Sequence, residues 1–362
     1  MRRSFSYALM GILLALALLA SAGNAPAQQQ QQPPPPNQQQ TQSQQSQQPK
    51  QQPPGGFSIS VTVPVVTVDV VVTDNEGNYL SGLKKENFRV LEDGQTQTIT
   101  NFGPTDAPIT MVMLLEFSQR GWYANYAYNA INWAAAFLNQ LKPNDWVALE
   151  TFSMRTNIEV DFTHNRQEVL QALSQLIMPE FHEANLFDAL TDTVDRMKDV
   201  KGKKAILLLA QGVDTFSKIN LDQTIKALRQ TDVTIFCVGV GELQFINQDA
   251  GGMGSISRMN YYQAQNQMKN FAAETGGRAW FPRFDGEIPG IMQDVASSLR
   301  NQYSLAYTPT NQAMDGKYRK IKVELVAPDG GPLTVLNQKG KKVKFQVYAR
   351  EGYTAPKSNV GP

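Results

Sequence analysis

The stretch Ile109–Arg120, ITMVMLLEFSQR, decides how this chain folds. Its first part is a continuous apolar run without polar alternation, which is typical of a strand buried on both faces in a helix-covered parallel sheet. In such sheets ligands bind beyond the carboxyl ends of the strands. Glu116, Ser118 and Arg120 end or follow this strand, so we expect them to lie where binding or chemistry occurs.

The region from residue 105 to residue 302 alternates buried strands with amphipathic helices. Lys204–Ala210 (KAILLLA) and Val233–Val240 (VTIFCVGV) are two further apolar runs, and Ala124–Leu141 repeats apolar residues at helical spacing. Alternation of this kind implies crossover connections and a parallel sheet. We therefore predict an α/β fold with a doubly wound, mostly parallel, Rossmann-like sheet. Gly241–Tyr262 is expected to be a long connection before a helix over Gln263–Thr275.

Two β-rich segments flank this region. Residues 57–104 and 303–354 contain runs typical of strands, among them single strands expected over Thr96–Phe102 and Lys342–Ala349, separated by turns such as Glu92-Asp93-Gly94 and Asp315-Gly316. Because neither segment is large, we predict that they pair into one small β-sandwich-like domain. Residues 355–362 are expected to form a tail.

The first 56 residues have the composition of targeting and spacer segments. Residues 1–27 combine two arginines, a short apolar run and an Ala-Pro-Ala end, which predicts a cleavable secretory signal peptide. The apolar run is too short to span a bilayer, so no integral span is expected after cleavage. Residues 28–56 are almost wholly glutamine and proline and predict a disordered linker. The expected destination is the periplasm or the cell exterior.

Charge and cysteine content exclude several classes of protein. The formal net charge is +1, and removal of the two signal-peptide arginines leaves the chain near neutrality, so no nucleic-acid partner is expected. The single cysteine, Cys237, cannot form an internal disulfide and is expected to be a buried apolar residue.

Several short motifs occur in a fixed order along the chain. Together they resemble a von Willebrand factor type A (VWA) domain within bacterial exported proteins of the acidobacterial VWFA-related type, over Val61–Pro356. The motifs are VDVVVTD (68–74), GL (82–83) with ENF (86–88), EDG (92–94), FL (137–138), KPND (142–145), LFDAL (186–190), ETGGR (274–278), Tyr303 with YTP (307–309), DGKYRK (315–320) and GY (352–353).

The resemblance implies a metal-ion-dependent adhesion site at the carboxyl end of the sheet, built from an Asp-x-Ser-x-Ser run, a threonine and a late aspartate. The corresponding positions here are Glu116, Ser118, Arg120, Ala184 and Gln211, so only Ser118 is retained. An arginine stays charged and cannot ligate a metal. We therefore predict a degenerate, metal-free site without a cofactor, in which Arg120 pairs with Glu116.

An alternative retains weak binding of Mg²⁺ or another divalent cation. In that reading Glu116, Ser118 and Asp214 supply the oxygen ligands that a hard cation needs. The ligand would then be bound in a cation-dependent way.

The sequence favours a non-catalytic adhesion or scaffold module that binds a protein. Arg120, Trp122 and Tyr123, together with Asn185, are the candidate partner-binding residues, since aromatic residues and arginine are enriched in interface hot spots. The partner's identity stays open.

Two other functions remain open at this point. One is a structural subunit of an envelope assembly that uses the edge strands of the β domain. The other is a hydrolase in which Glu116 and Asp214 act as an acid–base pair. The two histidines, His164 and His182, have no neighbouring nucleophile motif, so an enzyme is not expected.

Overall fold

The chain divides into two units, Met1–Ser60 and Val61–Pro362. The structure is a computed structural model that describes residues 64–104, 107–118, 124–176, 181–240, 255–336 and 342–357, all in the second unit. The expected signal peptide and linker lie outside the described residues. Within the described ranges no helix is both long and apolar enough to cross a bilayer.

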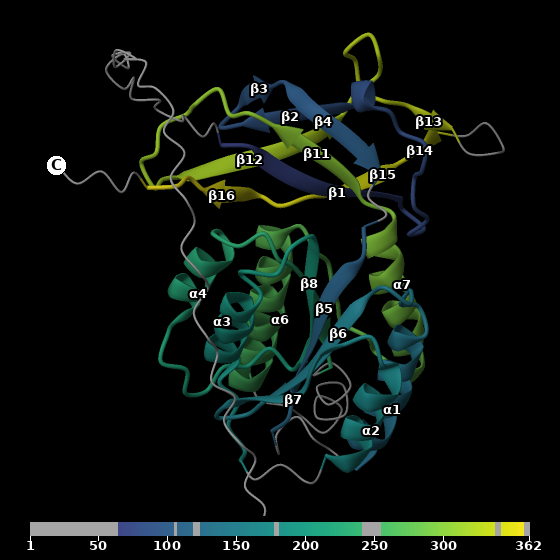
Figure 1. Cartoon of the computed structure of the whole chain (residues 1–362), viewed down its shortest axis with the longest axis vertical. Helices are drawn as coiled ribbons and strands as arrows, with labels where there is room; N and C mark the ends of the chain where they lie inside the picture. The colour runs from purple at the N-terminus through teal and green to yellow at the C-terminus, as the bar shows by residue number, and fades with distance from the viewer. Residues whose placement is uncertain are drawn as a thin grey trace, which may run out of the picture. The chain divides into compact units, whose positions relative to one another are not determined.

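The central sheet has the strand order β10-β9-β8-β5-β6-β7 (Figure 1). Strand β5 (Ile109–Glu116) lies in its interior, and all eight residues are buried, which confirms the prediction made from ITMVMLLE. β5 runs parallel to both neighbours, and β7 alone is antiparallel. The other strands are β6 (Trp146–Phe152), β7 (Thr156–Thr163), β8 (Lys203–Ala210), β9 (Thr234–Gly239) and β10 (Ala279–Trp280).

Helices cover both faces of this sheet, as a doubly wound fold requires. Alternate residues of β5 point to opposite faces: Met111 and Met113 join one buried cluster, and Val112 and Leu114 join the other. The first cluster includes α1 (Ala124–Leu138), α2 (Arg166–Gln175) and α7 (Ile288–Arg300), and the second includes α3 (Leu186–Arg196), α4 (Leu221–Leu228) and α6 (Ser255–Thr275). Cys237 is fully buried in the second cluster, as predicted.

One helix boundary differs clearly from expectation. Helix α6 begins at Ser255, eight residues before the expected start at Gln263, so part of the expected connection is helical. Arg258, Met259, Asn260 and Tyr262 are exposed on these first turns. The sequence there has no apolar face to bury, and periodicity therefore could not reveal the helix.

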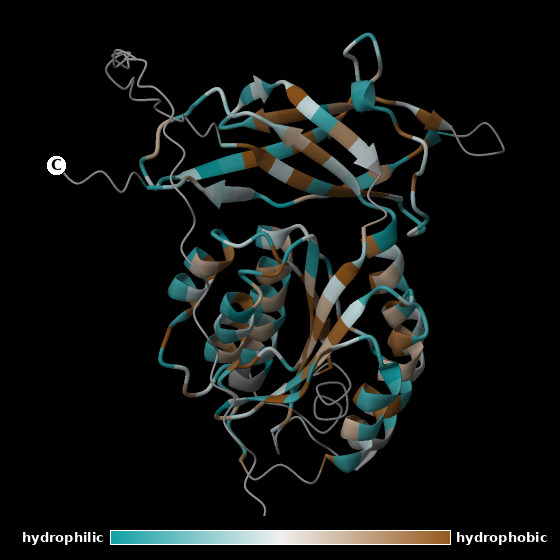
Figure 2. Ribbon diagram, viewed as in Figure 1, coloured by the Kyte–Doolittle hydropathy of each residue, from teal (hydrophilic) through white to brown (hydrophobic). Residues whose placement is uncertain are grey.

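The flanking segments form two antiparallel four-stranded sheets, with the orders β15-β1-β11-β4 and β16-β12-β2-β3. Each sheet contains strands from before and after the α/β region, which confirms the sandwich-like domain predicted from both segments. Alternate apolar residues fill its core (Figure 2), among them Val68, Val70 and Leu305. The strands are β1 (Val66–Asp74), β2 (Phe88–Glu92), β3 (Gln95–Gln97), β4 (Ile99–Pro104), β11 (Tyr303–Tyr307), β12 (Tyr318–Leu325), β15 (Phe345–Tyr348) and β16 (Gly352–Thr354), with the 3-10 turn η1 (Lys85–Asn87).

Two strand predictions need correction. The single strand expected over Lys342–Ala349 is divided into β14 (Lys342–Val343), which pairs with β13 (Val335–Leu336), and β15. The strand expected over Thr96–Phe102 is likewise divided into β3 and β4, which join different sheets. Both runs have continuous β propensity, but each changes partner within the run, and tertiary pairing overrides local preference.

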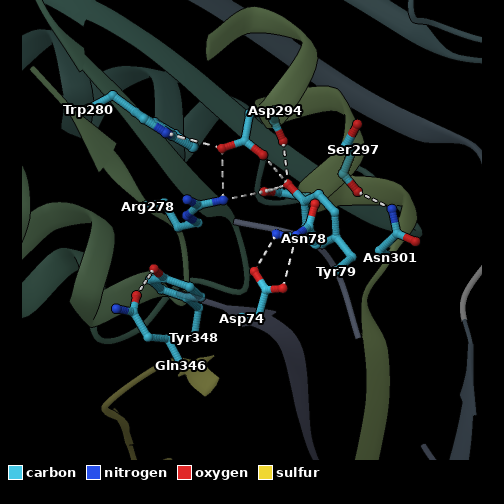
Figure 3. A network of polar contacts seen from close by, with 11 residues as sticks. Asp74, Asn78, Tyr79, Arg278, Trp280, Asp294, Ser297, Asn301, Gln346 and Tyr348 are labelled. Carbon is cyan, nitrogen blue, oxygen red and sulfur yellow. Dashed lines mark hydrogen bonds and ion pairs between the residues drawn. The ribbon is translucent and has the colours of Figure 1, made fainter. Parts of the chain in front are cut away.

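A polar network joins the β domain to helix α7 (Figure 3). The hydroxyl of Tyr79, in the β1–η1 loop, donates to the Asp294 carboxylate at 2.5 Å and lies 2.8 Å from the Ser298 hydroxyl. Arg278 pairs with the same carboxylate at 2.9 Å, and Trp280 donates to it at 3.2 Å. Burial and the neighbouring Asp294 raise the pKa of Tyr79, so this hydroxyl remains a donor.

The motif ETGGR (274–278) lies at the same junction. A Cβ on Gly277 would stand 1.9 Å from the Ile235 carbonyl oxygen, and one on Gly276, where φ is +81°, would stand 2.8 Å from the Arg350 backbone nitrogen. Glycine is therefore required for α6 to end against both β9 and the β15–β16 loop. Glu274 completes the contact by pairing with Arg229, whose carbonyl accepts from the Thr354 amide.

Asp294→Ala should lower the free energy of unfolding by about 2 kcal/mol, because three donors lose one shared carboxylate. Asp222→Ala is the matched control, since Asp222 makes an exposed helical pair with Lys226 that should contribute less than about 0.5 kcal/mol. Urea unfolding of both variants measures the difference. Equal effects in the two variants would show that the network does not hold the junction.

Candidate functional site

The candidate site lies at the end of the sheet that faces away from the β domain. Strand β5 begins at Ile109, shortly after β4 ends at Pro104, so the amino ends of the parallel strands adjoin the β domain (Figure 1). Glu116 ends the same strand about 23 Å further along, given the rise of about 3.3 Å per residue in a parallel strand. The β domain therefore leaves the carboxyl end of the sheet uncovered.

Glu116 connects the ends of two adjacent strands. Its side chain is buried, with 3% of the residue exposed. One carboxylate oxygen accepts from the Ser118 hydroxyl and the other from the backbone N–H of Gln211, both at 2.8 Å. The structure thus brings together three of the five positions expected to form the degenerate site. The carboxylate already satisfies two donors within the protein.

The fourth position, Ala184, lies at the start of α3 and is held by the loop after β8. Its N–H donates to the Thr215 hydroxyl at 2.8 Å, and its carbonyl accepts from the Thr215 N–H at 3.0 Å. Neighbouring Asn185 reaches the β6–β7 turn, donating from its backbone to Ser153 and from its side chain to Met154. Its Oδ1 atom is buried and has no hydrogen-bond partner in the described part of the chain.

Asp214 serves as a helix cap. Its Oδ1 atom accepts from the Phe187 N–H at 3.0 Å and from the Ser217 hydroxyl at 2.5 Å. A second contact joins the same two elements: the carboxylate of Asp188, on α3, accepts from the backbone N–H groups of Lys218 and Ile219, in the loop after β8. Carboxylates at a helix amino terminus satisfy its free N–H groups. This explains the aspartate without a metal or a proton transfer.

The remaining predicted partner-binding residues, Arg120, Trp122 and Tyr123, lie outside the described residues. The predicted Glu116–Arg120 pair therefore stays a prediction. Within the described ranges no group of three or more histidine, cysteine or carboxylate side chains is arranged to hold a metal ion.

Exposed apolar side chains surround this end of the sheet, and the sequence reasoning missed them. Six of the ten large apolar residues that are exposed in the described ranges lie on loops or helix starts at the carboxyl end, so exposure is concentrated there. The sequence does indicate one of them, Phe216, because a phenylalanine stands there within the polar loop VDTFSKIN (213–220). The six are Met154, Phe181, Phe216, Met259, Tyr262 and Phe284.

Comparison with known families agrees with this architecture. Residues 112–274 match the family model of the von Willebrand factor type A domain. The chain therefore contains a VWA domain over these residues. The matched region begins within β5 and ends one residue before α6 does, so it contains Glu116, Ser118, Ala184, Gln211 and every described loop between them.

Solved structures that are similar to part of this chain share little sequence with it. An aerotolerance-related membrane protein from Bacteroides fragilis is 11% identical, with a TM-score of 0.40, over 53% of this chain and 99% of its own. The vWF domain of the type V pili tip protein Mfa5 from Porphyromonas gingivalis is also 11% identical, with a TM-score of 0.41, over 53% and 95%. Proximal thread matrix protein 1 from the mussel byssus is 14% identical, with a TM-score of 0.43, over 58% and 51%. A comparison with curated proteins gave no match.

Glu116→Ala should lower the free energy of unfolding by about 2 kcal/mol, because it leaves the Ser118 hydroxyl and the Gln211 N–H without their acceptor. Glu116→Gln keeps one oxygen acceptor and should lose about half as much. Thermal and urea unfolding would measure both. If alanine and glutamine were equally tolerated, the carboxylate would not connect β5 to β8 in the way described.

Proposed function

We propose that this VWA protein is a non-catalytic interaction module of the cell envelope, periplasmic or secreted, that binds a protein partner with the carboxyl end of its sheet. We also propose that it is related to the exported proteins of the acidobacterial VWFA-related type. The Gln/Pro-rich residues 28–56 would give the domain reach, and the β domain would orient it.

The concentration of exposed apolar residues on loops and helix starts at the carboxyl end of the sheet is the observation that carries this proposal. Phe216 is 69% exposed in the loop after β8, and Met154 is 42% exposed in the turn after β6, and these two strands lie on either side of β5. Burial of apolar surface drives most protein association. The buried but unpartnered Oδ1 atom of Asn185, which a donor from a partner could satisfy, lies beside Met154.

The internal hydrogen bonds of the two carboxylates support a site without metal. Glu116 accepts from Ser118 and Gln211, and Asp214 accepts from Phe187 and Ser217. A hard divalent cation would have to compete with these donors for both side chains. The same hydrogen bonds argue against Glu116 and Asp214 as an acid–base pair, because each carboxylate accepts from its own donors within the protein.

We expect titration calorimetry with Mg²⁺, Mn²⁺ and Ca²⁺ to show no binding tighter than about 1 mM. The reason is that only Ser118 of the five site positions retains the expected residue type. Glu116→Ala serves as the matched control. Micromolar binding to the wild type that disappears in this variant would overturn the metal-free proposal and favour the alternative with Glu116, Ser118 and Asp214.

The double variant Phe216→Ser, Met154→Ser should reduce capture of the partner from envelope extracts by about tenfold or more, as expected when interface anchors are lost. Arg120→Ala with Trp122→Ala tests the residues proposed from sequence in the same assay. Val65→Ser with Met314→Ser is the matched control, because these side chains are equally apolar and exposed but lie on the β domain.

Loss of capture in the control instead would favour the alternative of a structural subunit that binds through the β domain. The edge strands of that domain are β15 and β4 in one sheet and β16 and β3 in the other. Three of them have only three or four residues, and β4 ends in Gly103-Pro104. Short edge strands, and edges that end in proline, are poor templates for an added strand.

A further inference from the structure

A cavity of about 310 Å³ lies at the carboxyl end of the sheet, between the loop after β8 and the first half of α6. Its volume is at the lower end of the range of about 300–1,000 Å³ that is typical of ligand-binding pockets. Three of its lining side chains are amides at helical spacing on α6, namely Asn260, Gln263 and Gln267. We call this cavity the amide pocket.

The three amides are not used by the protein itself. Within the described part of the chain, the side chains of Asn260, Gln263 and Gln267 make no hydrogen bond. The Oε1 atom of Gln267 is also buried, and a buried polar atom without a partner is costly. Each primary amide can donate two hydrogen bonds and accept two. The amide pocket therefore offers several donors and acceptors to a ligand.

A second part of the lining is backbone with unused hydrogen-bonding groups. Gly212 is buried, and in the described ranges neither its N–H and C=O groups nor those of Val213 make a hydrogen bond. The φ of Gly212 is +83°, and a Cβ there would stand 2.9 Å from the Ala264 carbonyl oxygen. Glycine is therefore required for the loop to approach α6 so closely. This close approach fixes the position of the loop against α6 beside the pocket.

The rest of the lining favours an uncharged ligand. The described residues that line the pocket include no lysine, arginine or histidine, so an anion would find no counter-charge. The carboxylate of Asp214 accepts from the Phe187 N–H and the Ser217 hydroxyl, so a cation would have to compete with these donors. A wholly apolar ligand would remove the amides from water without giving them partners. The Phe187 ring, packed edge-on against Phe271, adds an apolar wall.

We propose that the amide pocket binds an asparagine or glutamine side chain of the protein partner, presented on an extended segment. This inference rests on the proposed function, because it names what the carboxyl end of the sheet recognises. Two primary amides can pair reciprocally, since each has an acceptor oxygen and an NH₂ donor. The backbone groups of Gly212 and Val213 can pair with the backbone of the same segment. Exposed Phe216, Met259 and Tyr262 lie close to the lining residues in sequence and would contact the flanking residues.

Blocked peptides of the form acetyl-Ala-Ala-X-Ala-Ala-amide, with X as Gln, Glu, Lys or Leu, test this proposal. Each is titrated into the isotope-labelled full chain and followed by NMR. We expect the Gln peptide to shift the signals of Gly212, Val213 and the amide side chains of the pocket, with a dissociation constant of about 1 mM or below. The Glu, Lys and Leu peptides should bind about tenfold more weakly, because they leave a charge or the pocket amides unpaired.

A pair of variants locates the binding on α6. Asn260→Ala with Gln263→Ala removes two exposed amides of the pocket from a helix that tolerates alanine, and should weaken binding of the Gln peptide by about tenfold or more. Asn266→Ala with Asn270→Ala is the matched control, because it removes two exposed amides of the same helix that lie outside the pocket. The proposal is overturned if the Gln peptide shows no saturable binding, if the other peptides bind as tightly, or if both pairs of variants weaken binding equally.

Capture of the partner from envelope extracts separates this inference from the proposed function. If Phe216→Ser with Met154→Ser loses capture while the Gln peptide shows no preference, the amide pocket is wrong and the proposed function stands. Unchanged capture by that variant counts against the proposed function, whereas the peptide comparison decides the amide pocket. The peptide comparison uses the wild-type chain, so its outcome does not depend on the folding of any variant.

Discussion

The burial of β5 on both faces is the constraint on which the rest of this structure depends. A strand of eight buried residues must have a neighbour on each side and a helix layer on each face. Met111 and Met113 need one layer, and Val112 and Leu114 need the other. Once those contacts are made, only the two ends of the strands remain open to further contacts. The amino ends meet the β domain, which leaves the carboxyl ends uncovered by that domain.

The junction at the amino ends is built from residues that are far apart in the sequence. Asp294 of α7 gathers donors from Tyr79, Arg278 and Trp280, so the first β segment, β10 and the last helix meet at one carboxylate. Beside this network, Gly276 and Gly277 allow the end of α6 to approach the backbones of Arg350 and Ile235 closely. The two β segments thus enclose the α/β region in sequence, and the junction network holds that region to the domain that they form.

How much of the structure the sequence predicts depends on whether a feature is determined by neighbouring residues or by residues far away in the chain. The burial of β5, the doubly wound sheet and the composite β domain depend on apolar runs that pack in only one way, and all three were predicted. The start of α6 at Ser255 was missed because Arg258, Met259 and Tyr262 are exposed and leave no apolar face to read. The division of Lys342–Ala349 depends on which distant strand each residue meets, and local propensity contains no such information.

The site residues show the same limit at the level of single side chains. The sequence places Glu116, Ser118 and Gln211 at one end of the sheet, but it cannot show that Gln211 contributes a backbone N–H and not its side chain. Asp214 was a candidate ligand because of its residue type, whereas its position relative to Phe187 makes it a helix cap. A carboxylate that accepts from backbone donors is held in place by the fold itself. In the described part of the carboxyl end, Glu116 and Asp214 are thus held by hydrogen bonds within the protein, and the proposed recognition would rest on the exposed apolar side chains.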